Sequence, residues 1–245
     1  MNLALPLVVL LPLAAAGQVI IESYSFEAPT LPQAVPDGSA SGMTDSRWIT
    51  SQIATLTDVN VTLTLSNPTA GGAYNGDLFV SLQHADGYAV LLNRVGRREG
   101  AGLSEQFGYD DNGFDVTLDD EASNGDVHVY RLQLQPGATH DTPVDPGYVQ
   151  PLTGTWAPDG RHPLAGDPTI STPRTALLSV FDGQAGSGAW TLFVADLSGG
   201  GAVSLDRWSL QFTGAAVPEP EHWAMTAGGA LLAWAVWRRH RRGSP

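Results

Sequence analysis

The sequence predicts an all-β fold, an antiparallel β-sandwich, from two observations. Apolar and polar residues alternate with a period of two, and turn-forming residues separate the alternating runs. The turns include Asp86-Gly87 and Asn112-Gly113. The 28 glycines, 17 prolines and only 15% charged residues favour many turns between short strands over long helices.

Six runs carry the alternation, and the side chains of one run's apolar set point to one face of a strand. In chain order the sets are Val59, Val61, Leu63 and Leu65; Leu78, Val80 and Leu82; Phe114, Val116 and Leu118; His128, Tyr130, Leu132 and Leu134; Trp190, Leu192 and Val194; and Trp208, Leu210 and Phe212. We therefore expect Trp190 and Trp208 in the core. Residues 136–176 show little alternation and predict a long surface excursion.

The chain is strongly acidic over most of its length. Four of the 12 basic residues are Arg238, Arg239, Arg241 and Arg242, and all 25 acidic residues precede them. Residues 1–237 therefore carry eight basic and 25 acidic side chains, a net charge of −17. Such a surface repels nucleic acid, so we expect no nucleic-acid partner. No cysteine is present, which excludes disulfides and a cysteine nucleophile.

The N-terminal residues predict export. Residues 3–16 form an apolar run that ends in three alanines before Gly17. The run is too short to span a bilayer and is typical of a signal peptide. We assign residues 1–16 to that peptide and residues 17–31 to an N-terminal extension.

The C-terminal residues combine three features in a fixed order. The segment Val217-Pro218-Glu219-Pro220 precedes an apolar stretch at 222–237, and an arginine cluster follows at 238–242. As a helix, about 15 apolar residues extend roughly 22 Å, less than the ~30 Å hydrocarbon core, so we expect a short transmembrane helix with its arginines in the cytoplasm. This order resembles the PEP-CTERM sorting signal, here 217–242, which implies removal of the tail by an exosortase-like enzyme. An ordinary tail anchor is the alternative.

Several blocks between the two ends share the spacing of one known domain. They are Val35-Pro36-Asp37-Gly38, residues 75–82 (NGDLFVSL), residues 90–96 (VLLNRVG), residues 114–122 (FDVTLDDEA), residues 178–183 (LSVFDG), residues 188–196 (GAWTLFVAD) and residues 201–212. Together they resemble the P domain (P/Homo B domain) of kexin- and furin-like subtilases over residues 32–214. The resemblance implies a jelly-roll β-sandwich. In subtilases this domain follows a protease domain, whereas the segment before residue 32 is too short for one, so we expect a free-standing domain.

The residues predict no catalytic activity. A hydrolytic triad needs a serine, a histidine and a carboxylate that converge. Around Ser187 the nucleophile motif Gly-x-Ser-x-Gly fails, because Ala185 and Ala189 replace both glycines. The six histidines lie in no block typical of a subtilase active site. We therefore expect no catalytic residues.

Acidic side chains indicate one candidate cofactor, Ca²⁺. The densest acidic run lies at 110–121, and Ca²⁺ prefers carboxylate oxygens. The spacing of an EF-hand is absent, and a solvated acidic loop is the alternative. The candidate ligands are Asp119 and Asp120, which lie in a block that resembles the P domain, and then Asp110, Asp111 and Asp196.

Two functions follow from these observations. The first is an exported, non-catalytic interaction or structural module of the cell envelope, surface or extracellular matrix, tethered transiently to the membrane and binding a surface protein or polysaccharide. The second is a stand-alone accessory domain that supports a secreted subtilisin- or kexin-like serine endopeptidase. The missing catalytic residues favour the first. Trp48 and Trp156 lie near loops and are the candidate aromatic contacts to a partner.

Overall fold

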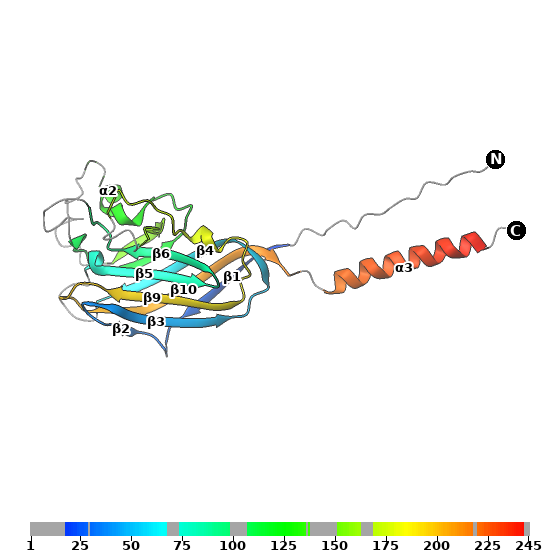
Figure 1. The fold of residues 1–245 in the computed structure, drawn as a ribbon, viewed down its shortest axis with the longest axis horizontal. Coiled ribbons are helices and arrows are strands. Elements are labelled where there is room, and N and C mark those ends of the chain that lie inside the picture. Colours follow the sequence, from blue (N-terminus) through cyan, green and yellow to red (C-terminus); the bar gives the residue numbers. More distant parts are fainter. Residues whose placement is uncertain are drawn as a thin grey trace.

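A computed structural model describes the protein over most of its length. The described residues are 18–28, 30–67, 74–98, 107–135, 137, 151–162, 169–217 and 220–242. The predicted signal peptide lies outside them, as do Pro218 and Glu219 of the predicted processing motif. The described chain is all-β, with two sheets packed face to face and few helices (Figure 1).

The larger sheet has six strands. They are β1 (Val19–Phe26), β2 (Gln33–Val35), β4 (Ile53–Ser66), β7 (Phe114–Leu118), β8 (Leu152–Trp156) and β10 (Val203–Ala216). Their order is β1-β10-β4-β7-β8, and β2 also pairs with β10. β7 and β8 run parallel, whereas the other pairs of this sheet are antiparallel.

The smaller sheet has four antiparallel strands in the order β3-β9-β5-β6. They are β3 (Ser39–Ile49), β5 (Leu78–His84), β6 (Gly87–Asn93) and β9 (Gly188–Asp196). β3 lies at one edge, and its outward-facing residues include Trp48. A two-residue turn, Ala85-Asp86, joins β5 to β6.

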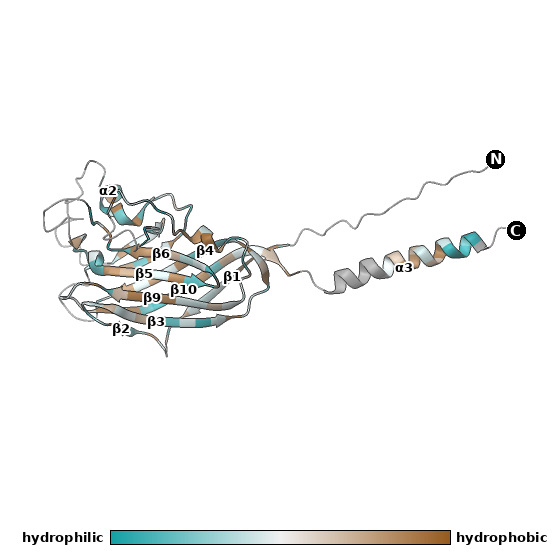
Figure 2. Cartoon of the chain, viewed as in Figure 1, coloured by the Kyte–Doolittle hydropathy of each residue, from teal (hydrophilic) through white to brown (hydrophobic). Residues whose placement is uncertain are grey.

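One continuous core fills the space between the sheets. Five of the six predicted alternating runs are strands, and their apolar residues are buried, as the period of two requires. Trp190 and Trp208 are 0% and 1% exposed, which confirms their predicted place in the core. Figure 2 shows the apolar residues along the strands. Trp156, one of the two candidate aromatic contacts to a partner, is buried at the end of β8 and is not available for such a contact.

The run at 128–134 is not a strand. It forms a 3₁₀ turn, η2 (Val127–Val129), followed by the short helix α2 (Tyr130–Leu134). The Asp126 side chain accepts a hydrogen bond from the His128 amide and so caps the turn. An apolar run this short is compatible with the period of a strand and with that of a helix. Here the tertiary contacts of Tyr130 and Arg131 with Asp111 favour the helix.

Three segments, among them the short β2, take part in the larger sheet although the sequence pattern did not indicate strands there. β1 pairs with β10 over its whole length, so the sandwich includes part of the predicted N-terminal extension. β8 lies within the predicted excursion at 136–176 and extends the sheet beside β7. Further described turns are η1 (Asn75–Asp77) and η4 (Leu178–Phe181).

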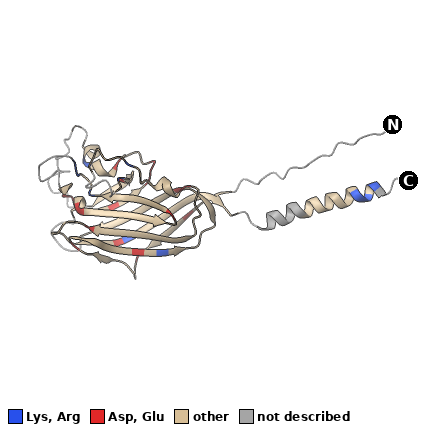
Figure 3. Ribbon diagram, in the orientation of Figure 1, with Lys and Arg blue, Asp and Glu red and all other residues tan. Residues whose placement is uncertain are grey.

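The C-terminal part forms helix α3 (Pro220–Arg242) beyond the end of β10, and its arginines gather at its far end (Figures 1 and 3). The sequence predicts a transmembrane helix over 222–237. Yet among the helices of the described chain, none has both the length and the apolar character that crossing a membrane demands.

Candidate functional site

The predicted calcium ligands Asp110 and Asp111 bind a guanidinium group. Arg131 donates from Nε to Oδ2 of Asp111 and from Nη2 to Oδ1, each at 2.8 Å, and Arg131 also forms an ion pair with Asp110. The Tyr130 hydroxyl donates a further hydrogen bond to Asp111. Asp111 and Arg131 are both buried, and the positive charge of the guanidinium balances the negative charge of the carboxylate without a metal ion. This pair stabilises the attachment of α2 to the sandwich.

Asp120 has a capping role. Its two carboxylate oxygens accept hydrogen bonds from the amides of Leu178 at 3.1 Å and Ser179 at 2.7 Å. These amides belong to the first turn of η4 and have no partner within it. The carboxylate therefore joins the loop after β7 to η4.

Asp119, in contrast, belongs to a cluster of carboxylates. Carboxylate oxygens of Asp58, Asp119 and Glu121 all lie within 4.8 Å of one another. Burial, followed by repulsion from Asp119 and Asp182, raises the pKa of Asp58. A side-chain hydrogen bond with Asp119, followed by burial, raises the pKa of Glu121. A divalent cation would relieve this repulsion, so among the described residues these three form a group that fits Ca²⁺.

Asp196 lies apart from that cluster, at the end of β9. It is 2% exposed, and one oxygen accepts a hydrogen bond from the Ser198 amide at 3.3 Å. Burial, with repulsion from Asp77 and Asp37, raises the pKa of Asp196 to about 6. Burial likewise raises the pKa of Asp77.

The structure therefore distributes the five predicted ligands among four environments. Only Asp119 joins a cluster that fits a metal, and the partners Asp58 and Glu121 were not among the predicted ligands. Asp58 lies on the outward face of β4 with Asn60, whose amide donates to it at 3.0 Å. The strand pairing of β4 with β7 brings Asp58 near Asp119, and no local sequence signal reveals that pairing.

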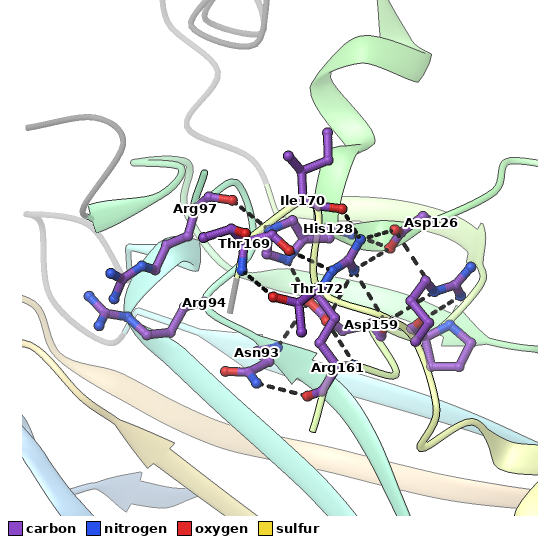
Figure 4. A network of polar contacts seen from close by, with 12 residues as sticks. Asn93, Arg94, Arg97, Asp126, His128, Asp159, Arg161, Thr169, Ile170 and Thr172 are labelled. Carbon is purple, nitrogen blue, oxygen red and sulfur yellow. Dashed lines mark hydrogen bonds and ion pairs between the residues drawn. The ribbon is translucent and has the colours of Figure 1, made fainter. Parts of the chain in front are cut away.

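A buried polar network connects the end of β6 with the segment before α2 and the segment after β8 (Figure 4). At its centre, His128 Nδ1 contacts Oδ2 of Asp159 at 2.7 Å, and both side chains are 0% exposed. Arg161 binds Asp159 at 3.2 Å and Asp126 at 2.7 Å. These contacts connect the segment before α2 to the segment after β8.

Two further side chains extend the network to neighbouring segments. The amide of Asn93, at the end of β6, donates from Nδ2 to the carbonyl of Arg161 at 2.9 Å. Arg174 donates to the carbonyl of Pro158 at 2.6 Å. The network thus joins four segments of the chain: the end of β6, the segment before α2, the segment after β8 and the segment around Arg174. Several of its hydrogen bonds are buried and charge-assisted.

The His128–Asp159 pair has the chemistry of two members of a hydrolytic triad. Its second ring nitrogen, Nε2, contacts the carbonyl oxygen of Arg97 at 2.8 Å, which is not a nucleophile. A second buried imidazole of the described residues, that of His84, contacts the carbonyls of Ala189 at 3.0 Å and Ala185 at 2.9 Å. Both rings are therefore occupied by structural contacts.

Ser187, the serine nearest to a nucleophile motif, has a structural role as well. Its hydroxyl donates to the carbonyl of Ser51 at 3.0 Å and accepts from the Ser51 amide at 2.8 Å. The two bonds join the loop before β9 to the β3–β4 connection. The hydroxyl of Ser187 is thus bonded to backbone atoms of Ser51.

An open groove lies where β3, the β5–β6 turn and the loop before β9 meet. Its volume is about 490 Å³, and its lining includes Trp48, His84, Gln184 and Ser187. Trp48 is 79% exposed, whereas the other tryptophans of the sandwich are at most 2% exposed. Grooves of this size are typical of sites for small ligands or for part of a larger one. The groove is therefore the candidate binding site.

Comparisons with known proteins give no family for this chain. No protein-family model matches it, and no curated protein matches it. Among solved structures, the complex of the Aeromonas sobria serine protease with its chaperone is similar at a TM-score of 0.44 and 15% identity, over 82% of this chain and 28% of that chain. The A. sobria serine protease alone gives a TM-score of 0.41 and 15% identity, over 80% and 27%. This chain thus spans little more than a quarter of either, and so distant a similarity carries no functional conclusion.

Proposed function

We propose that the protein is an exported, non-catalytic interaction module of the cell surface or extracellular matrix. The observation that carries this proposal is the groove beside Trp48, where the one highly exposed tryptophan of the sandwich lines a cavity. Tryptophan is enriched at the centres of protein binding sites, where a large rigid ring gains area at little entropic cost. The occupied rings of His84 and His128 support a role in binding rather than in hydrolysis.

The finer features of the proposal come from the sequence. We propose a jelly-roll sandwich of the P-domain type, on the motif blocks at 32–214, and a sorting tail at 217–242 that an exosortase-like enzyme removes. We also propose that Asp58, Asp119 and Glu121 bind Ca²⁺. The large negative charge of residues 1–237 supports a partner that is not nucleic acid.

Two measurements on the full-length chain test the function. First, a serine-reactive fluorophosphonate probe should label no residue, because the Ser187 hydroxyl is bound to Ser51. Second, fluorescently labelled protein should bind saturably to cells of the native host, and Trp48→Ala should weaken that binding whereas Ile21→Ala, at another exposed apolar side chain, should not.

Each measurement has an outcome against the proposal. Stoichiometric labelling of one serine would show a nucleophile and overturn the non-catalytic role. Absence of saturable binding to the host surface would overturn the interaction role. Co-purification of a subtilase with the wild type would instead favour the accessory function in proteolysis.

A further inference from the structure

We infer that the groove beside Trp48 binds a neutral polysaccharide, with one pyranose ring stacked on the indole. This inference depends on the proposed interaction function and names the class of its ligand. Three features of the groove carry it: the apolar surface that it offers, the rigidity of its walls, and the polar groups at its rim.

The apolar surface combines one large ring with small neighbours. Trp48 points outward from the edge strand β3, opposite Ala189 of β9 in the strand register. Ala85, Ala185 and Gly188 also line the groove, so no bulky side chain covers the indole from that side. A pyranose ring presents its C–H groups on a flat face, and an open indole beside small residues matches such a face.

The walls of the groove are fixed before any ligand binds. His84 contacts the carbonyl of Ala185 in the loop before β9 and the carbonyl of Ala189 in β9, and it stacks on Trp190 with ring centroids 4.0 Å apart. The paired hydrogen bonds between Ser51 and Ser187 hold the same loop from the other side. A site ordered in advance loses little conformational entropy on binding, which matters most for weak ligands such as sugars.

The rim supplies hydrogen-bonding groups that suit hydroxyls. Asp86, exposed in the β5–β6 turn, lines the groove and supplies a carboxylate that can accept hydrogen bonds from sugar hydroxyls. Gln184 lines the groove as well, and Nε2 of its amide donates to the Val180 carbonyl at 2.9 Å, which holds the side chain in place.

The charge of the groove excludes the acidic polysaccharides. Its lining contains no lysine or arginine, and Asp86 contributes a negative charge. The net charge of −17 over residues 1–237 adds a general repulsion of polyanions. A neutral chain of pyranose units can stack on the indole and form hydrogen bonds at the rim without this electrostatic repulsion.

The test uses the full-length chain and defined probes. Cellohexaose, mannohexaose and a neutral polysaccharide fraction from the native host's envelope are titrated by isothermal calorimetry and tryptophan fluorescence. We expect at least one neutral probe to bind, hexagalacturonate not to bind, and Trp48→Ala to lower the affinity about tenfold or more. Trp48→Phe should retain much of the affinity because it keeps an aromatic face. Asp86→Ala should weaken binding because it removes the exposed acceptor at the rim.

Controls separate this inference from the proposed function. Ile21→Ala should bind like the wild type, and circular dichroism should show that each variant is folded. Failure of every neutral probe to bind, or equal affinity of the wild type and Trp48→Ala, overturns the inference. If Trp48-dependent binding to a purified envelope protein appears instead, the groove is a protein-docking site: the polysaccharide is then excluded while the interaction function stands. If the wild type does not bind host cells at all, both the polysaccharide inference and the proposed interaction function are overturned.

Discussion

Trp190 shows at the residue scale how the sandwich gains its stability. Its ring is 0% exposed and stacks on His84, and it lies with ring centroids 5.0 Å from Phe181 and 4.7 Å from Phe212. These partners come from the end of β5, from η4 and from the opposite sheet. One side chain therefore joins both layers.

Replacing this ring should strongly destabilise the protein. Trp190→Ala leaves a cavity in a rigid core, and we expect the free energy of unfolding to fall by about 3 to 5 kcal/mol. Chemical denaturation followed by circular dichroism measures the change. Trp48→Ala is the matched control, because Trp48 is 79% exposed and should lose little stability. A midpoint that hardly moves for Trp190→Ala would contradict its place in the core.

Asp196 should make stability depend on pH. Because its folded pKa is raised to about 6, the native state favours the protonated form, and the resulting stability is present below the ordinary pKa near 4 and lost as the pH rises through 6. Asp196→Asn removes the charge and keeps the shape. We expect the variant to match the wild type near pH 4 and to exceed it by about 2 to 3 kcal/mol at pH 8.

The measurement is the free energy of unfolding of both proteins across that pH range. Asp86→Asn, in the exposed β5–β6 turn, serves as the control and should follow the wild type. An Asp196→Asn variant that runs parallel to the wild type at every pH would show that the buried carboxylate does not titrate in this window.

At the scale of elements, the sequence predicts the strands that have a local pattern and misses those that depend on contacts between distant segments. Five alternating runs were recognised because a strand buries every second residue, which is a local pattern. The run at 128–134 has the same pattern. However, Arg131 forms an ion pair with Asp111, which lies 20 positions earlier in the sequence, and the segment is helical. β1 and β8 owe their strand character to their neighbours β10 and β7, which are distant in sequence.

The candidate groove illustrates the same limit. The sequence indicates Trp48 as a candidate contact because it lies near a loop. The residues around it, Gln184 and Ser187, come from a loop more than 130 positions away, and β3–β9 pairing brings them together. Such a site needs the sheet order, which no single segment encodes.

The carboxylate cluster of Asp58, Asp119 and Glu121 joins β4 to the loop after β7 and should respond to Ca²⁺. A cation that binds only the folded state raises the melting temperature, by roughly 5 to 10 °C at a concentration about 100 times its dissociation constant. We expect this rise for the wild type and its loss in Asp58→Asn combined with Asp119→Asn. Asp86→Asn, outside the cluster, should keep the rise. Equal shifts in all three proteins would indicate general screening of negative charge instead.

At the scale of the whole molecule, the tail should be a processing signal. Pro218 and Pro220 restrict the residues before them, and Pro218 and Glu219 separate the sandwich from α3, so we expect an extended, accessible strip between the two. Intact-mass measurement of protein from the native host should give a chain that lacks the tryptophan-rich helix. A host without an exosortase should give a C-terminus at Pro245. An unprocessed chain in the native host would contradict the prediction.

The pairing of β1 with β10 has a mechanical consequence. The register places Val19 opposite Ala215, so the chain enters and leaves the sandwich at one end (Figure 1). Tension applied between residues 18 and 217 therefore peels β1 from β10 one hydrogen-bonded pair at a time, whereas tension along the strands from opposite ends loads many pairs at once. In an optical trap the first geometry should open at the lower force. The sandwich should therefore resist tension least when it is pulled at the end where the chain enters and leaves it.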